Sequence, residues 1–169
     1  MADILLRGTP ITTVGELPEV GSCAPDATLV DADLTDVKLS DYSDKKLLLN
    51  IFPSIDTGIC AQSARTFNEA VAELGDDIRI LCISKDLPFA LGRFCAAEGI
   101  DGVKTLSAFR SSFGDDYGLT MATGGLTTLL SRSIVVIDSA GQVAYTQQVP
   151  EIGQEPDYEA ALNALAATA

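Results

Sequence analysis

The chain of 169 residues contains no histidine and few basic residues. Without histidine it can form neither a Ser-His-Asp or Cys-His catalytic group nor a zinc site with histidine ligands. Lysine and arginine number 11 against 24 aspartate and glutamate residues, so the net charge is −13. This charge disfavours nucleic acid and anionic membrane surfaces as partners. A nucleophile in this chain must therefore be activated by cations, backbone dipoles or hydrogen bonds.

Long apolar runs are also absent. No window approaches the ~18 continuous apolar residues of a membrane span, and residues 1–20 show neither the basic nor the apolar segment of a secretory signal. We therefore expect a soluble, cytoplasmic protein. Hydrophobic residues make up 47% of the chain and charged residues 21%, as in ordinary globular proteins. The length fits one domain of about 100–200 residues, so we predict a single domain over residues 1–169.

Cysteine is present but scarce. The four cysteines are Cys23, Cys60, Cys82 and Cys95. In a cytosolic chain of this length they do not indicate a disulfide scaffold. A metal site, a redox pair and buried inert thiols remain possible. A zinc site made from all four is disfavoured because no two are closely spaced.

The middle of the chain predicts a strand–helix–strand unit. Residues 46–52 and 78–84 are short, almost wholly apolar runs, typical of strands buried on both faces. Between them, apolar residues recur at three- and four-residue steps, which predicts a helix that ends at Gly75. Such a unit is expected to be a right-handed parallel crossover.

The flanking segments complete an α/β pattern. We expect antiparallel strands over 28–40, a helix over 86–99, a short helix and loop over 107–118, a hairpin around "DSAG" over 133–149 and an amphipathic helix over 155–167. The predicted fold is therefore an α/β layered structure with a mixed central β-sheet flanked by helices and an N-terminal β-hairpin.

The segment "PSIDTGIC" (53–60) places a thiol at a helix start. Pro53 ends the strand, and Thr57 is a candidate N-cap for a helix that begins near Gly58. Cys60 then lies in the first turn, where unpaired N–H groups and the helix dipole favour a thiolate. The residues alone leave two interpretations open, namely a reactive thiolate and a small buried thiol.

The same segment resembles a known family. "PSIDTGIC" fits the P-x-x-x-T-x-x-C pattern of the peroxiredoxins, and "NIFPSIDTGICAQSARTFN" is similar to their thiol peroxidase subfamily. "LCISKDLPFALGRFCAAEGI" and "EPDYEAAL" resemble two further blocks of that subfamily. The similarity extends from about residue 3 to residue 167. It implies a thioredoxin-like fold.

The resemblance implies a role for each of four residues. Cys60 would be the peroxidatic cysteine, which attacks a hydroperoxide and becomes a sulfenic acid. Thr57 would hydrogen-bond the thiolate and the peroxide, and Pro53 would shape and dry the pocket. Arg132 would stabilise the thiolate and hold the peroxide oxygens. Without the resemblance, Arg132 would be interpreted as a solvated charge at a strand end.

Cys95 is the resolving cysteine that the resemblance implies. It would condense with the sulfenic acid of Cys60 to form an intramolecular disulfide. Because both cysteines lie in predicted helices, we expect a local rearrangement around 58–64 and 90–98 in each turnover. Without the resemblance, Cys95 would be a residue of an apolar helix face.

The other candidate residues receive no catalytic role. Cys82 lies within a predicted buried strand and is interpreted as an inert core thiol. Cys23 lies in a turn-like stretch without a nearby cation or helix start. Arg65 lies five residues after Cys60, outside the neighbour spacing of a helix, and is interpreted as a surface charge.

Two other functions can be compared with this prediction. A cysteine phosphatase needs C-x-x-x-x-x-R, whereas only four residues separate Cys60 from Arg65 and none is glycine. A non-enzymatic peroxide sensor or redox relay would use the same Cys60–Cys95 switch, so the sequence does not exclude it.

The resemblance therefore implies an atypical two-cysteine peroxiredoxin. It would reduce hydrogen peroxide and organic hydroperoxides, be recycled by thioredoxin and form a homodimer. No metal or organic cofactor is implied, because the sulfur carries the two electrons.

Overall fold

The computed structural model describes residues 1–168, and residue 169 of the predicted domain lies outside the described residues. The strands are β1 Asp3–Leu6, β2 Thr9–Thr12, β3 Thr28–Val30, β4 Asp36–Lys38, β5 Lys46–Ile51, β6 Ile78–Ser84, β7 Lys104–Ser107, β8 Ser133–Ile137 and β9 Val143–Gln148. The helices are α1 Gly58–Val71, α2 Pro88–Glu98, α3 Phe113–Asp116 and α4 Tyr158–Ala167, with a 3₁₀ turn, η1, over Leu39–Tyr42.

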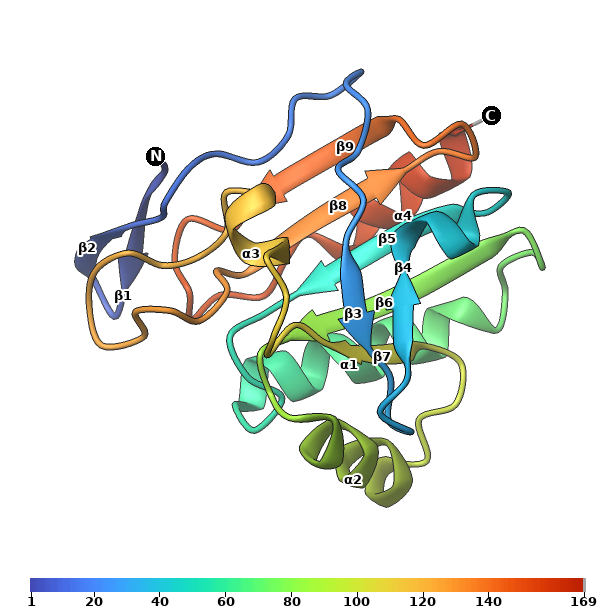
Figure 1. The fold of residues 1–169 in the computed structure, drawn as a ribbon, viewed down its shortest axis with the longest axis horizontal. Coiled ribbons are helices and arrows are strands. Elements are labelled where there is room, and N and C mark those ends of the chain that lie inside the picture. Colours follow the sequence, from blue (N-terminus) through green and yellow to red (C-terminus); the bar gives the residue numbers. More distant parts are fainter. Residues whose placement is uncertain (169) are drawn as a thin grey trace.

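A mixed seven-stranded sheet forms the centre of the protein. Its order is β4-β3-β7-β6-β5-β8-β9, in which β5, β6 and β7 are parallel and the other pairs are antiparallel (Figure 1). The predicted α/β class with a mixed central sheet is confirmed. The predicted hairpin over 133–149 is also confirmed, because β8 and β9 pair antiparallel around the turn.

Two short hairpins precede the central strands. The antiparallel strands expected over 28–40 are β3 and β4. The predicted fold includes an N-terminal β-hairpin, and the first hairpin, β1–β2, forms a separate two-stranded sheet; the strand pattern located N-terminal strands only over 28–40. Its turn has positive φ at Arg7 (50°) and Gly8 (79°), and the main-chain N–H groups of both residues donate to the Glu151 carboxylate at 2.9 and 3.0 Å. The turn depends on a carboxylate 143 or more positions away, which local pattern does not reveal.

The strand–helix–strand unit is present as β5–α1–β6, with parallel pairing throughout. The predicted end of its helix at Gly75 is wrong. The helix ends at Val71, because the next N–H groups bond three residues back, from Glu73 to Ala70 and from Leu74 to Val71. This tighter 3₁₀-type spacing closes the helix before the glycine is reached.

The sheet carries a core on each face. Alternate residues of β5 separate the two cores, with Leu47, Leu49 and Ile51 packing with α3 and the segment that follows it. Leu48 faces the other core, where α1, α2 and α4 cover the sheet (Figure 1). Cys60 and Cys95 both belong to this second core. None of the helices in residues 1–168 has the length and apolarity that crossing a membrane requires.

A glycine after α3 allows a close approach to the N-terminal segment. Gly118 has φ 68°, and a Cβ there would overlap the main chain of Glu16. Gly141 has φ 81°, but nothing lies within 4 Å of its Cβ position.

We expect Gly141→Ala to cost about 1 kcal/mol of unfolding free energy through strain alone, and Gly118→Ala to cost about 3 kcal/mol because a clash is added. Urea unfolding followed by circular dichroism measures both; equal losses would contradict the clash.

Candidate active site

The turn between β5 and α1 has a defined hydrogen-bonded geometry. Thr57 is the N-cap of α1 with φ −96° and ψ 147°, as predicted, and its Oγ1 accepts a hydrogen bond from the main-chain N–H of Cys60 at 3.4 Å. The Thr57 hydroxyl donates to the carbonyl of Ser54 at 3.1 Å. Thr57 thus contacts the main chain of Cys60, and Pro53 is buried at the start of the turn.

The thiol of Cys60 lies beside a buried guanidinium. Cys60 is 0% exposed and Arg132 is 2% exposed. Arg132 Nη1 donates to Cys60 Sγ at 3.3 Å, and Nε donates to the carbonyl of Ile152 at 2.9 Å. The structure therefore brings Arg132 to Cys60 instead of placing it in solvent.

No carboxylate balances the charge of Arg132. None of the ion pairs among residues 1–168 includes it. A buried cation is costly without a partner of opposite charge. The guanidinium of Arg132 donates instead to the sulfur of Cys60 and to the carbonyl of Ile152.

Sheet pairing brings the two groups together. Ile51 at the end of β5 pairs with Ser133 at the start of β8. The segment that follows β5 and the residue that precedes β8 therefore lie at the same edge of the sheet. Gln148 of β9 fixes the main chain there, because its side-chain amide donates to the Arg132 carbonyl at 3.1 Å.

An open cavity of about 550 Å³ adjoins Arg132. Pro53, Thr57 and Arg132 line it together with apolar side chains that include Leu6, Leu126, Leu129 and Ile152. The volume lies within the range of small-molecule sites. The cavity therefore has the size of a small-molecule site, a partly apolar lining, and Arg132 at its wall.

Cys95 lies in the last turns of α2, away from this cavity. Its side chain is half-buried and its Sγ is 3.6 Å from Thr105 Oγ1 on β7. The carbonyl of Cys95 accepts from the N–H groups of Gly99 and Ile100, which close the helix. The predicted helix over 86–99 is confirmed, with Gly99 left-handed at its end.

Cys60 and Cys95 are both free thiols. Arg132, which contacts Cys60, directly precedes β8, and Thr105, which contacts Cys95, lies in β7. In the sheet β8 lies three strands from β7, which is roughly 14 Å at about 4.8 Å per strand. A disulfide requires Cα atoms within ~7 Å. The predicted rearrangement around 58–64 and 90–98 stays a prediction, and this separation is consistent with it.

The remaining candidates lie outside the site. Arg65 pairs with Glu98 of α2 through two hydrogen bonds of 2.9 and 3.1 Å. Cys82 is fully buried in β6, and Asn50 Nδ2 donates to its sulfur at 3.5 Å. Cys23 is exposed. In residues 1–168, no group of three or more His, Cys, Asp or Glu side chains is arranged to hold a metal ion.

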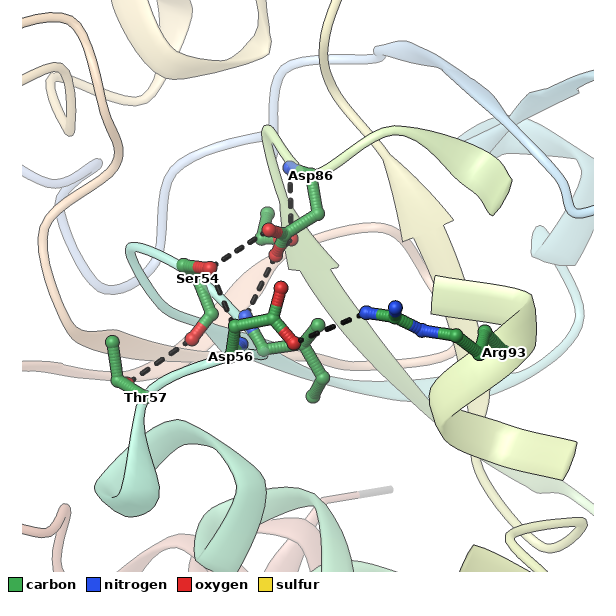
Figure 2. Close-up of polar contacts among 7 residues, drawn as sticks. Ser54, Asp56, Thr57, Asp86 and Arg93 are labelled. Carbon is green, nitrogen blue, oxygen red and sulfur yellow. Dashed lines mark hydrogen bonds and ion pairs between the residues drawn. The ribbon is translucent and has the colours of Figure 1, made fainter. Parts of the chain in front are cut away.

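Sequence reasoning missed the polar residues that support the turn. Figure 2 shows Ser54 and Asp86 joined by a hydrogen bond, with Thr57 bonded to Ser54 and Asp56 paired with Arg93. Asp86 follows β6, which is parallel to β5. Since the carboxyl ends of neighbouring parallel strands share one edge, the position of Asp86 in "SKD" was the available signal.

Comparison with known proteins identifies the family. The Redoxin family model matches residues 19–162. The chain is 58% identical over 167 residues to a thiol peroxidase of Mycobacterium tuberculosis, covering 99% of this chain and all of the relative. It is 54% identical over 165 residues to a thiol peroxidase of Corynebacterium glutamicum, covering 98% and 99% of the two chains. The chain belongs to the thiol peroxidase family.

The solved structures agree with the family. A peroxiredoxin-like protein from Aquifex aeolicus superposes with a TM-score of 0.93 at 36% identity, covering 98% of this chain and 96% of that chain. This likeness confirms the predicted thioredoxin-like fold. It also confirms the predicted resemblance to the peroxiredoxins.

Burial raises the pKa of the Cys82 thiol from 9.0 to about 12. Iodoacetamide reacts with thiolates, so we expect native protein at pH 8.5 to be alkylated at the exposed Cys23 and spared at Cys82, and unfolded protein to react at both. Because the folded thiol keeps its proton while the unfolded thiol releases it near pH 9.0, stability should fall as pH rises from about 9 to about 12. Peptide mass spectrometry checks the labelling; rapid native labelling of Cys82 would contradict its burial.

Proposed function

We propose that the protein reduces hydrogen peroxide and organic hydroperoxides with Cys60 as the peroxidatic cysteine and Cys95 as the resolving cysteine. Its family membership shows the coarser activity, a thiol-dependent reduction of peroxides by an enzyme. The observation that best supports the residue assignment is the buried contact of 3.3 Å between Arg132 Nη1 and Cys60 Sγ at the start of α1.

The first chemical step uses the thiolate form of Cys60, which is the reactive form of a cysteine. Cys60 attacks the terminal oxygen of the hydroperoxide, the O–O bond breaks, and the sulfur is oxidised by two electrons. With uptake of one proton, the products are a sulfenic acid at Cys60 and an alcohol, or water from hydrogen peroxide. The guanidinium of Arg132 is suited to stabilise the charge that moves onto the leaving oxygen.

Thr57 and Pro53 have supporting roles in this proposal. The Thr57 hydroxyl caps α1 at the N–H of Cys60, and it lines the cavity from which a peroxide would approach. We assign it the role of orienting the peroxide oxygens. Pro53 is buried beside the same cavity and limits the access of water to it.

Two further steps regenerate the thiol. The thiol of Cys95 attacks the sulfenic sulfur, forming a disulfide and releasing water. A dithiol reductant of the thioredoxin type then reduces the disulfide to two thiols and becomes a disulfide itself. The sulfur atoms carry all of the electrons, so the proposal includes no metal and no organic cofactor.

The chain's relatives do not favour the alternative of a non-enzymatic sensor, because full-length identities of 54–58% are to peroxidases.

A homodimer is part of the proposal. Three large apolar side chains, Leu87, Phe89 and Phe109, are 50%, 67% and 41% exposed near the carboxyl ends of β6 and β7. A second copy of the chain would cover them, which supports the dimer.

The residue assignment is tested by a peroxidase assay with thioredoxin, thioredoxin reductase and NADPH. We expect wild-type protein to turn over many equivalents of hydroperoxide and Cys60→Ser to be inactive. Cys95→Ser should consume about one equivalent of peroxide and then stop, since no disulfide partner remains. A fully active Cys60→Ser variant would refute the assignment, and one turnover by the wild type would favour the sensor.

Arg132 is tested by the rate at which Cys60 is oxidised. We expect Arg132→Met to lower the second-order rate constant by about 10²–10³-fold, because both the charge and its aimed donors are lost. Arg132→Lys should recover part of the rate, since it keeps the charge without the planar fork. Arg65→Met, which removes a surface ion pair with Glu98, is the matched control and should stay within about twofold of wild type. Equal rates for Arg132→Met and Arg65→Met, both folded by circular dichroism, would disprove the role.

A further inference from the structure

A carboxylate outside the predicted site holds the segment that leads to Cys60. Asp86 lies between the end of β6 and the start of α2, the helix of Cys95. Its Oδ1 accepts a hydrogen bond from Ser54 Oγ at 2.8 Å, and its Oδ2 accepts from the main-chain N–H of Ile55 at 2.7 Å (Figure 2). Both donors belong to the turn between β5 and α1.

Asp86 is itself fixed to the sheet. Ser84 Oγ at the end of β6 donates to its Oδ2 at 2.6 Å and accepts from its main-chain N–H at 3.3 Å. Its carbonyl accepts a short hydrogen bond from Ser107 Oγ at the end of β7. Ser84 and Ser107 are both fully buried. The hydrogen bonds with Ser84 and Ser107 therefore fix the position of the carboxylate relative to the ends of β6 and β7.

The hydrogen bonds continue from Asp86 to the reactive thiol's helix. Ser54 receives two bonds from Thr57 at its carbonyl, at 3.2 Å from N–H and 3.1 Å from the hydroxyl. Thr57 Oγ1 then accepts from the main-chain N–H of Cys60 at 3.4 Å. Asp86, Ser54, Thr57 and Cys60 thus form a continuous chain of contacts. A shift of Asp86 displaces the cap of α1.

A second contact joins the same two segments at the surface. Arg93 of α2 lies 3.5 Å from Asp56 of the turn, with side chains 72% and 63% exposed. An ion pair this exposed contributes little. Asp86 is half-buried and accepts two hydrogen bonds from the turn, so we assign the connection mainly to Asp86.

We propose that Asp86 is a positioning residue that holds the Cys60 turn against the segment that begins the Cys95 helix. We call the two hydrogen bonds of its carboxylate with Ser54 and Ile55 the clasp. The inference rests on the proposed function. The clasp holds Cys60 in the folded conformation that reacts with peroxide, and it opposes the unwinding that the Cys60–Cys95 disulfide requires. Release of the clasp should therefore slow the first step and speed the second.

The fate of the sulfenic acid reports the balance between these steps. In one reaction, the sulfenic acid of Cys60 and the thiol of Cys95 give a disulfide and water. In the competing reaction, the sulfenic acid reduces a second hydroperoxide, giving a sulfinic acid at Cys60 and an alcohol. A tighter clasp leaves the sulfenic acid exposed to the second peroxide for longer. The sulfinic fraction therefore measures how firmly the turn is held.

The test compares Asp86→Ala, Asp86→Asn and Ser54→Ala. Asp86→Ala removes both carboxylate oxygens that accept from Ser54 and Ile55. Asp86→Asn keeps one acceptor oxygen for the Ile55 N–H, and its amide can donate to Ser54 Oγ, so it preserves the clasp without the charge. Asp138→Ala is the matched control, because Asp138 accepts from the main-chain N–H groups of Ala140 and Gln142 in the remote β8–β9 turn.

Rapid-quench mass spectrometry of the thioredoxin-recycled protein would follow the sulfenic, disulfide and sulfinic forms of Cys60. We expect Asp86→Ala to slow sulfenic acid formation about tenfold and to lower the sulfinic fraction several-fold, because the hydrogen bonds that hold the turn are lost. Ser54→Ala should show a smaller change in the same directions. Asp86→Asn and Asp138→Ala should match wild type within about threefold.

Hydrogen exchange on the reduced proteins gives a readout that needs no peroxide. The clasp predicts faster exchange over 53–64 in Asp86→Ala than in Asp86→Asn or Asp138→Ala. Unchanged exchange and an unchanged sulfinic fraction in Asp86→Ala, with an active wild type, would overturn the inference. The inference would also be overturned if Asp86→Asn behaved like Asp86→Ala. The charge of Asp86 would then be the important property, and the geometry of its hydrogen bonds would not. An inactive wild type would refute the proposed function, while the exchange result would still judge the clasp.

Discussion

The buried contact between Arg132 and Cys60 is the interaction on which the site depends. A guanidinium with 2% of its residue surface exposed needs an anion, and the ion pairs among residues 1–168 supply none. The structure places the sulfur of Cys60 3.3 Å from Arg132 Nη1. This contact is the basis on which we propose Cys60 as the nucleophile of a chain that has no histidine.

This contact requires three segments that are distant in sequence. The pairing of Ile51 with Ser133 places the end of β5 beside the start of β8. The carbonyl of Ile152 accepts from Arg132 Nε and aims the other end of the guanidinium at the sulfur. On the opposite side of the turn, Asp86 joins Ser54 and Ile55 to the end of β6. The central parallel strands thus serve as the common frame for the helix cap and the cation.

Local patterns predicted the parts of the fold that local physics decides. Apolar runs marked β5 and β6, periodicity marked α1, and Thr57 was identified as a cap because capping involves neighbours in sequence. The local pattern did not locate the hairpin β1–β2, because its turn is held by Glu151 from the far end of the chain. Asp86 and Gln148 were missed for the same reason, since their roles arise only when strands pair. Arg132 was found through the family resemblance, because a single arginine before a strand otherwise resembles a solvated charge.

Part of the cavity wall comes from segments outside the central sheet. Leu6 belongs to the β1–β2 hairpin, and Leu126 and Leu129 belong to the loop before Arg132. Cys60, Thr57 and Asp86, by contrast, are tied to the central strands and α1. Substitutions at Leu6, Leu126 or Leu129 would therefore change the shape and polarity of the cavity while the contact between Arg132 and Cys60 stays in place.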